Sequence, residues 1–185
     1  MGNATDRKEN LPRLPREAYR GIVDGHWVFN IAGKKRGWLN ERFFLQFQLI
    51  ATHAFSRYRI ASPCLCLMPD HIHLLLMGYH WGESDQRLAV HFIRKHLKTP
   101  LAPTEFQKTP YDHLLRKKER DRSAFQRTAG YIRNNPVRAG LVDEDGGNEW
   151  PYQCAIVPGY PDLHPGQKDF WDLFWRIYYR ILVTD

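Results

Sequence analysis

The sequence lacks any long apolar run. Even the stretch Phe43–Ala51 is interrupted by Gln46 and Gln48. A helix that crosses a membrane needs about 18 consecutive apolar residues, so the sequence predicts no membrane span. The opening residues MGNATDRKEN carry charges but no apolar stretch follows them. This pattern is not typical of a secretory signal.

Cysteine is also scarce. The chain has three cysteines, Cys64, Cys66 and Cys154. An odd number of thiols cannot all be paired within one chain, which argues against a disulfide framework. Without an export signal, we expect reduced cysteines in a cytoplasmic protein.

The overall composition is typical of a globular domain, because 43% of the 185 residues are hydrophobic and 25% are charged. A chain of this length is typical of one domain rather than two.

Positive charge is concentrated in the middle of the chain. The net charge is +7, and residues 116–138 alone contribute +6, whereas residues 139–185 contribute −5. A basic segment beside an acidic one favours binding of a polyanion such as the phosphate backbone of a nucleic acid, although a solvated charged face is the alternative. The candidate DNA-binding residues are Arg116, Lys117, Lys118, Arg120, Arg127, Arg133 and Arg138.

Strand and helix patterns alternate along the chain. Two apolar runs around the turn pair Pro69-Asp70 predict a tight hairpin. Asn40 is placed to cap a helix, and Pro100 is expected to end another. The predicted strands are 26–31, 64–68, 71–77 and a short one within 110–116, and the predicted helices are 41–58, 85–98 and an aromatic one in 168–182. Such an order indicates an α+β fold with a mostly antiparallel sheet.

One further helix is predicted between Ser123 and Asn135. Ser123 and Gln126 fit a capping box, and Pro136 disfavours helical geometry at the residue before it. On this helix Tyr131 and Asn135 lie one turn apart, about 5–6 Å between Cβ atoms. The two side chains are therefore expected to face the same space.

A pair of histidines interrupts the apolar hairpin. Because His71 and His73 are two residues apart in a strand, their rings project from the same face. Two imidazoles on an apolar strand need partners, which are either a divalent metal or hydrogen-bonding groups in the core. A zinc site that adds Cys64 and Cys66 is conceivable, although the spacing is unusual for structural zinc and buried thiols are the simpler interpretation.

Two motifs together resemble a known family. MPDHIHLLL, at 68–76, and YIRNNPVRAGLV, at 131–142, resemble the REP-associated tyrosine transposases, small relatives of the single-strand insertion-sequence transposases in the HUH nuclease superfamily. The resemblance implies a ferredoxin-like, RRM-like sheet flanked by helices. It covers a transposase domain at 21–152, between an N-terminal arm (1–20) and a C-terminal loop with an aromatic helix (153–185).

The resemblance also implies roles for individual residues. Tyr131 matches the nucleophile, His71 and His73 match the metal-binding pair, and Asn135 matches the third metal ligand. The implied cofactor is Mg²⁺ or Mn²⁺, both of which accept oxygen and nitrogen ligands. Asp70 is expected to orient a histidine or to complete the turn. Asp112, next to His113, also lies in a segment similar to the family's, but the sequence assigns neither residue a role.

The implied activity is metal-dependent cleavage and rejoining of single-stranded DNA at hairpins, through a 5′-phosphotyrosine and without a nucleotide cofactor. The implied partner is single-stranded or hairpin DNA, and relatives that work as dimers make a homodimer an open alternative to a monomer. The other function that the residues allow is a non-catalytic nucleic-acid-binding module on the same fold, in which the histidines are structural.

Overall fold

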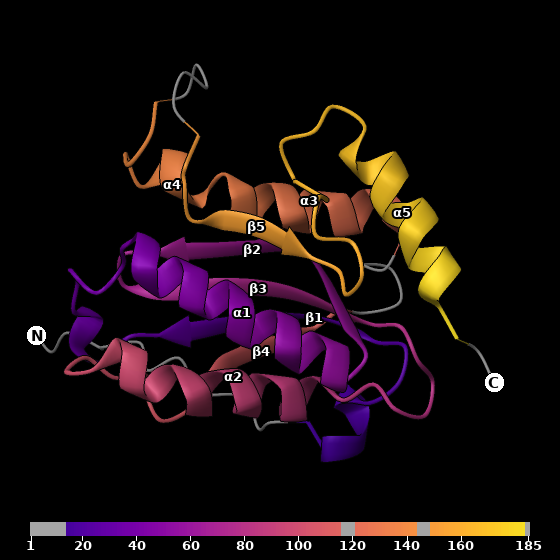
Figure 1. Ribbon diagram of the computed structural model, residues 1–185, viewed down its shortest axis with the longest axis horizontal. Helices are drawn as coiled ribbons and strands as arrows, with labels where there is room; N and C mark the ends of the chain where they lie inside the picture. Colours follow the sequence, from indigo (N-terminus) through magenta and orange to yellow (C-terminus); the bar gives the residue numbers. More distant parts are fainter. Residues whose placement is uncertain (1–13, 116–120, 144–148, 184–185) are drawn as a thin grey trace, which may run out of the picture.

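The computed structural model describes residues 14–115, 121–143 and 149–183. Within them, one antiparallel sheet has the strand order β4-β1-β3-β2-β5 (Figure 1). The bounds are β1 Asp24–Asn30, β2 Ile60–Met68, β3 His71–Gly78, β4 Tyr111–Leu114 and β5 Gln153–Ile156. The first four strands have the order of a ferredoxin-like β-α-β-β-α-β unit, so the predicted α+β class and architecture are confirmed.

Helices cover both faces of this sheet. Figure 1 shows α1 (Glu41–Arg57) and α2 (Gln86–Leu101) together on one side. The other side packs against α3 (Arg122–Arg133) and α5 (Phe170–Ile181), and each side has its own apolar core. The short helices are η1 Arg16–Tyr19, η2 Ala32–Lys34 and α4 Asn135–Arg138. Among the described helices, none has both the length and the apolar character needed for a membrane crossing.

The hairpin of β2 and β3 divides its side chains between the two cores. Ile72 and Leu74 belong to the core under α1 and α2, whereas Leu75 belongs to the core under α3 and α5. Successive strand residues point to opposite faces, so His71 and His73 lie on the α3 side. The hairpin itself is confirmed, with Pro69-Asp70 as its turn.

The predicted start of α1 is also confirmed. The Asn40 side chain accepts a hydrogen bond of 2.9 Å from the Phe43 amide, which satisfies one of the free N–H groups at the helix start. Phe43, Phe47 and Ala51 follow at helical spacing and are buried. The first turn is therefore fixed both by its cap and by the apolar face that continues it.

Three local predictions need correction. Helix α2 continues through Pro100 to Leu101, because a proline in the last turn removes a single hydrogen bond. Helix α3 begins at Arg122, so Ser123 is not its cap, and the Ser123 hydroxyl donates to Asp121 instead. Strand β5 lies at the start of the segment that the sequence predicts as a loop, because four residues carry little periodic signal.

The C-terminal aromatic helix packs onto the domain. Phe170, Phe174 and Tyr178 are buried in the core that α5 shares with α3. The Tyr178 hydroxyl donates a 2.8 Å hydrogen bond to the carbonyl of Gly78, at the end of β3. Segment 153–185 thus supplies one sheet strand and part of a core in addition to the expected loop and helix.

All three cysteines are free and buried. Burial raises the pKa of Cys66 and of Cys154 to about 12, and it raises that of Cys64 well above its usual range. The described residues hold no group of three or more His, Cys, Asp or Glu side chains arranged for a metal. Buried thiols, not a cysteine–histidine zinc site, are therefore what the structure contains.

The first testable prediction concerns Gly78, which leaves no room for a side chain. A Cβ atom there would lie 2.0 Å from the Gly21 carbonyl oxygen and 2.9 Å from Ser84 Cβ. We expect Gly78→Ala to lower the free energy of unfolding by about 1–3 kcal/mol, since overpacking forces the backbone to shift. Gly82→Ala is the control, because a Cβ at Gly82 meets nothing within 4 Å. Urea denaturation that ranks the two variants equally would contradict this prediction.

The second prediction concerns thiol reactivity. A thiol reagent attacks the thiolate, and the buried cysteines with raised pKa values hold almost none at pH 8. We expect slow labelling of the native protein by a chromogenic disulfide reagent and rapid labelling of three thiols in denaturant. Rapid labelling of the native protein would show that one cysteine is accessible after all.

Candidate functional site

The two histidines predicted from the sequence converge at one point on β3. Their Nε2 atoms lie 2.9 Å apart, and the ring planes are nearly perpendicular. His73 is 6% exposed and His71 is half-buried. Two ring nitrogens that face each other this closely either share a hydrogen bond or serve as ligands of one cation.

The outer nitrogen of each ring is held by a different partner. Asp70 Oδ1 lies 2.6 Å from His71 Nδ1, and His26 Nε2 lies 2.9 Å from His73 Nδ1. Metal-binding histidines usually have this second contact, which fixes the ring and its tautomer. Both expectations for Asp70 are met, because it also forms part of the turn.

His26 is a third histidine of the site, and no sequence motif indicates a role for it. It lies on β1 and stacks on His73, with 5.1 Å between ring centroids. No short motif joins residues 26 and 73, and only the register between β1 and β3, which pairs His26 with Leu75, brings the two rings together. A correct prediction of this strand pairing from the sequence would have identified the contact between His26 and His73.

Burial keeps the imidazole rings of His73 and His26 neutral. Desolvation, helped by the neighbouring histidines, lowers the pKa of His73 to about 3 and that of His26 to about 4. Neutral imidazole is the form that binds a metal. The geometry of the pair and the neutral ring of His73 therefore both suit a divalent cation.

Tyr131 and Asn135 lie at the C-terminal end of α3 and the start of α4. The Tyr131 side chain is 49% exposed, whereas Ile132 and Ala129 face the core. The amide nitrogen of Asn135 donates to the carbonyls of Tyr131 and Ile132, at 3.0 and 3.2 Å. The phenol is therefore outside the apolar interior, and the asparagine is tied to the turn that carries it.

Helix α3 lies on the same face of the sheet as the histidines. It packs against β2, and Ile132 shares an apolar cluster with Cys66. Cys66 is the direct register partner of His73. The structure thus brings the predicted histidine pair and the predicted nucleophile helix to one face.

The described residues hold no group of three His, Cys, Asp or Glu side chains arranged for a metal, so a third protein ligand at the histidine pair would be of another type. An amide oxygen such as that of Asn135 is a chemically suitable ligand. The Asn135 Nδ2 contacts turn its Oδ1 away from the helix carbonyls. The assignment of Asn135 stays a prediction.

The predicted DNA-binding arginines have different surroundings. The Arg138 guanidinium lies over the Tyr131 ring, 4.9 Å from its centroid. Arg127 contacts Ser123 and is exposed, whereas Arg133 donates a 2.7 Å hydrogen bond to the Pro165 carbonyl. Arg133 therefore ties α3 to the C-terminal segment. The other predicted residues, Arg116, Lys117, Lys118 and Arg120, lie outside the described residues.

The two residues left without a role in the sequence lie on β4. Asp112 accepts a hydrogen bond from the Tyr19 hydroxyl. His113 is the register partner of His26 across β1 and β4. Asp112 therefore joins the edge strand to η1, and His113 extends the row of histidines toward that edge.

Comparison with known proteins supports the fold. No protein-family model matches the chain, and no curated protein matches it. A solved structure described as a REP-associated tyrosine transposase bound to a REP hairpin is similar, with a TM-score of 0.61 and 17% sequence identity. The match covers 94% of this chain and 92% of that chain. Over nearly its whole length, this chain therefore has the fold of a REP-associated tyrosine transposase.

Proposed function

We propose that this protein binds hairpin DNA and cuts and rejoins single-stranded DNA, with Tyr131 as the nucleophile. One observation carries the proposal. The pair His71 and His73, with the outer nitrogen of each ring held by a partner, lies on the sheet face that also carries the helix of an exposed tyrosine. The similarity of the fold to a hairpin-bound tyrosine transposase is consistent with this function.

In the proposed reaction, the Tyr131 oxygen attacks the phosphorus atom of a DNA phosphodiester. The bond from phosphorus to the 3′ oxygen breaks, and that oxygen leaves as a 3′-OH after taking up the proton that the phenol loses. The 5′ side stays on the protein as a phosphotyrosine. Attack of another 3′-OH on this ester reverses the step, so neither a nucleotide cofactor nor an external energy source is needed.

The residues present fit a divalent cation, Mg²⁺ or Mn²⁺. His71 and His73 would hold it through Nε2, with Asn135 as the third protein ligand. A bound cation would polarise the phosphate and offset the negative charge that develops on its oxygens. Mixed nitrogen and oxygen ligands suit Mn²⁺ better than Mg²⁺.

The arginines near Tyr131 would position the DNA. Arg138 already lies against the ring of Tyr131, and contact with a backbone phosphate would bring that phosphate close to the phenol. Arg127 is one helical turn before Tyr131 and is exposed, so it suits a second phosphate contact. Phosphate contacts of this kind fix the register of a strand without reading its sequence.

A non-catalytic DNA-binding module is the second candidate. Hydrogen bonding alone would satisfy the histidines, because His71 and His73 contact each other as well as Asp70 and His26. A structural role of this kind requires no metal. The two candidates differ in whether a covalent bond to DNA forms.

The third prediction separates the two candidates. The protein is mixed with Mn²⁺ and labelled hairpin DNA that carries single-stranded flanks, and the covalent adduct is measured on a denaturing gel. We expect an adduct with the wild type and none with Tyr131→Phe, because the phenylalanine lacks the attacking oxygen. Tyr179→Phe, a change of the same kind at a tyrosine that is 51% exposed on α5, is expected to form the adduct normally.

The metal is tested in the same assay. Chelation by EDTA and His71→Ala are each expected to abolish the adduct while hairpin binding, measured by fluorescence anisotropy, changes less than tenfold. Hairpin binding without any adduct in the wild type would support the non-catalytic module. An adduct that persists in Tyr131→Phe would rule out Tyr131 as the nucleophile.

A further inference from the structure

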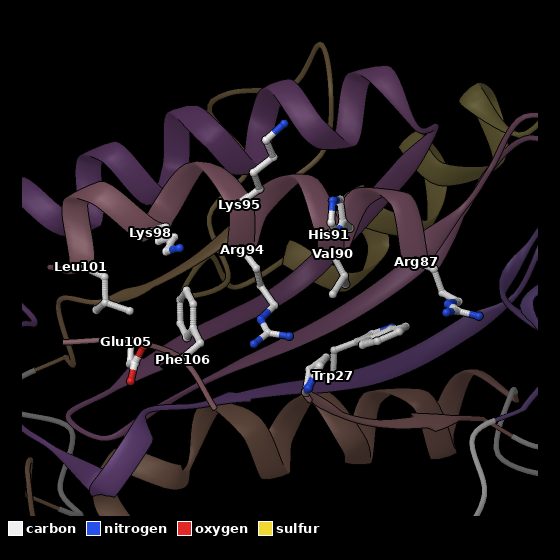
Figure 2. A pocket seen from close by; sticks show the side chains of 11 residues that line it. Trp27, Arg87, Val90, His91, Arg94, Lys95, Lys98, Leu101, Glu105 and Phe106 are labelled. Atoms are coloured by element: carbon white, nitrogen blue, oxygen red, sulfur yellow. The ribbon is translucent and has the colours of Figure 1, made fainter. Parts of the chain in front are cut away.

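A cleft of about 340 Å³ lies beside α2 (Figure 2). It is bordered by α2 on one side and by Glu105, Phe106 and Pro110 on the other, over Trp27 of β1. The Trp27 side chain belongs to the core under α1 and α2, so the cleft lies on the sheet face opposite the histidine pair. No residue of the proposed catalytic site lines it.

The cleft is strongly basic. Its charged lining residues are Arg87, Arg94, Lys95, Lys98 and Glu105, and His91 adds a titratable ring. Four cationic residues and one carboxylate therefore line the cleft, and α2 itself contains neither Asp nor Glu. Like charges gathered in one cleft repel each other, and a bound anion would remove this repulsion.

The arginines of this cleft are held by the protein, whereas the lysines are not. Arg94 donates hydrogen bonds to the carbonyls of Gln107 and Lys108, and Figure 2 shows it beside Phe106. Arg87 lies over the Tyr19 ring, 5.7 Å from its centroid. Lys95 and Lys98 are exposed, and the described part of the chain shows no ion pair or hydrogen bond for either. Their ammonium groups are therefore available to a ligand.

The spacing of the cations points to a linear anion. Arg87, Arg94 and Lys98, with His91 between the first two, recur every three or four positions, so they lie on successive turns, about 5.4 Å apart along the axis. A row of this kind matches a chain of phosphates better than a single phosphate.

We propose that the α2 cleft is a second DNA-binding site that holds backbone phosphates of the hairpin at a distance from the phosphate that Tyr131 attacks. This inference rests on the proposed function, because it assumes that hairpin DNA is the substrate. Contacts with phosphates bring affinity and salt dependence without sequence specificity. The cleft would therefore act in binding and not in the chemical step.

The fourth prediction compares two double variants that each remove two positive charges. Lys95→Gln with Lys98→Gln alters the cleft, whereas Arg176→Gln with Arg180→Gln alters the exposed face of α5. We expect hairpin affinity at low salt to fall at least tenfold more in the cleft variant than in the control. The slope of log affinity against log salt concentration should decrease by about 1 per lysine in the cleft variant, as measured by fluorescence anisotropy.

The rate of adduct formation at saturating DNA should be unchanged in the cleft variant, since neither lysine belongs to the proposed catalytic site. An equal loss of affinity in both double variants, or an unchanged salt slope, would overturn the proposal. Failure of the wild type to form an adduct would instead contradict the catalytic function and leave the slope comparison valid.

A second inference rests on the contact between His26 and His73. A His73 ring that binds a cation through Nε2 must carry its proton on Nδ1, and that N–H then donates to His26 Nε2, 2.9 Å away. We infer that His26 is a positioning residue that fixes the orientation and tautomer of His73. This inference also rests on the proposed function, because it assumes a cation at the histidine pair.

The fifth prediction uses Mn²⁺ binding to the protein without DNA, measured by electron paramagnetic resonance. We expect His26→Phe to weaken Mn²⁺ binding about 10- to 100-fold, the usual effect of losing such a partner. His26→Gln keeps a hydrogen-bond acceptor and should restore part of the affinity. His53→Phe, at an exposed histidine stacked on Phe92, should leave it unchanged.

Unchanged Mn²⁺ affinity in His26→Phe would overturn the positioning role alone. A wild type that binds no Mn²⁺ would overturn the role together with the metal site, and the adduct assay would then report separately on Tyr131. Equal weakening by His26→Phe and His26→Gln would show that ring packing, not the accepted hydrogen bond, matters.

Discussion

The candidate site depends on the two-residue period of strand β3. Because neighbouring side chains point to opposite faces, Ile72 and Leu74 enter the core under α1 and α2, while His71 and His73 face the side that carries α3. A shift of one residue in the register would place the imidazoles in an apolar core. The tight turn at Pro69-Asp70 and pairing with strands on both sides fix that register.

The hairpin, α1 and α5 could be predicted from the sequence because their signals are local. Asn40 caps α1, Pro69-Asp70 joins two apolar runs, and the aromatic residues of α5 recur at helical spacing. The start of α3 could not be predicted correctly, because Ser123 and Gln126 satisfy the capping-box pattern, whereas the helix already includes Arg122, the residue before the expected cap. Strand β5 was missed because its pairing with β2, and not its own short sequence, defines it.

The candidate site was only partly predictable for a related reason. His71 and His73 are neighbours in sequence, so their common face follows from strand geometry alone. The contact of His26 with His73 depends on how β1 pairs with β3, which no local pattern encodes. The α2 cleft likewise forms only where segment 103–110 packs against α2, whereas the basic segment that the charge pattern singles out is 116–138.

The hydrogen bond from Arg133 to the Pro165 carbonyl joins the end of α3 to the chain's last segment, and Phe125 at the other end of α3 contacts Trp175. Both ends of α3 are thus attached to residues of the same polypeptide. If two copies of the chain exchanged α3, each copy would lose these contacts and would have to form them with the other molecule. The contacts at the two ends of α3 therefore oppose an exchange of this helix alone.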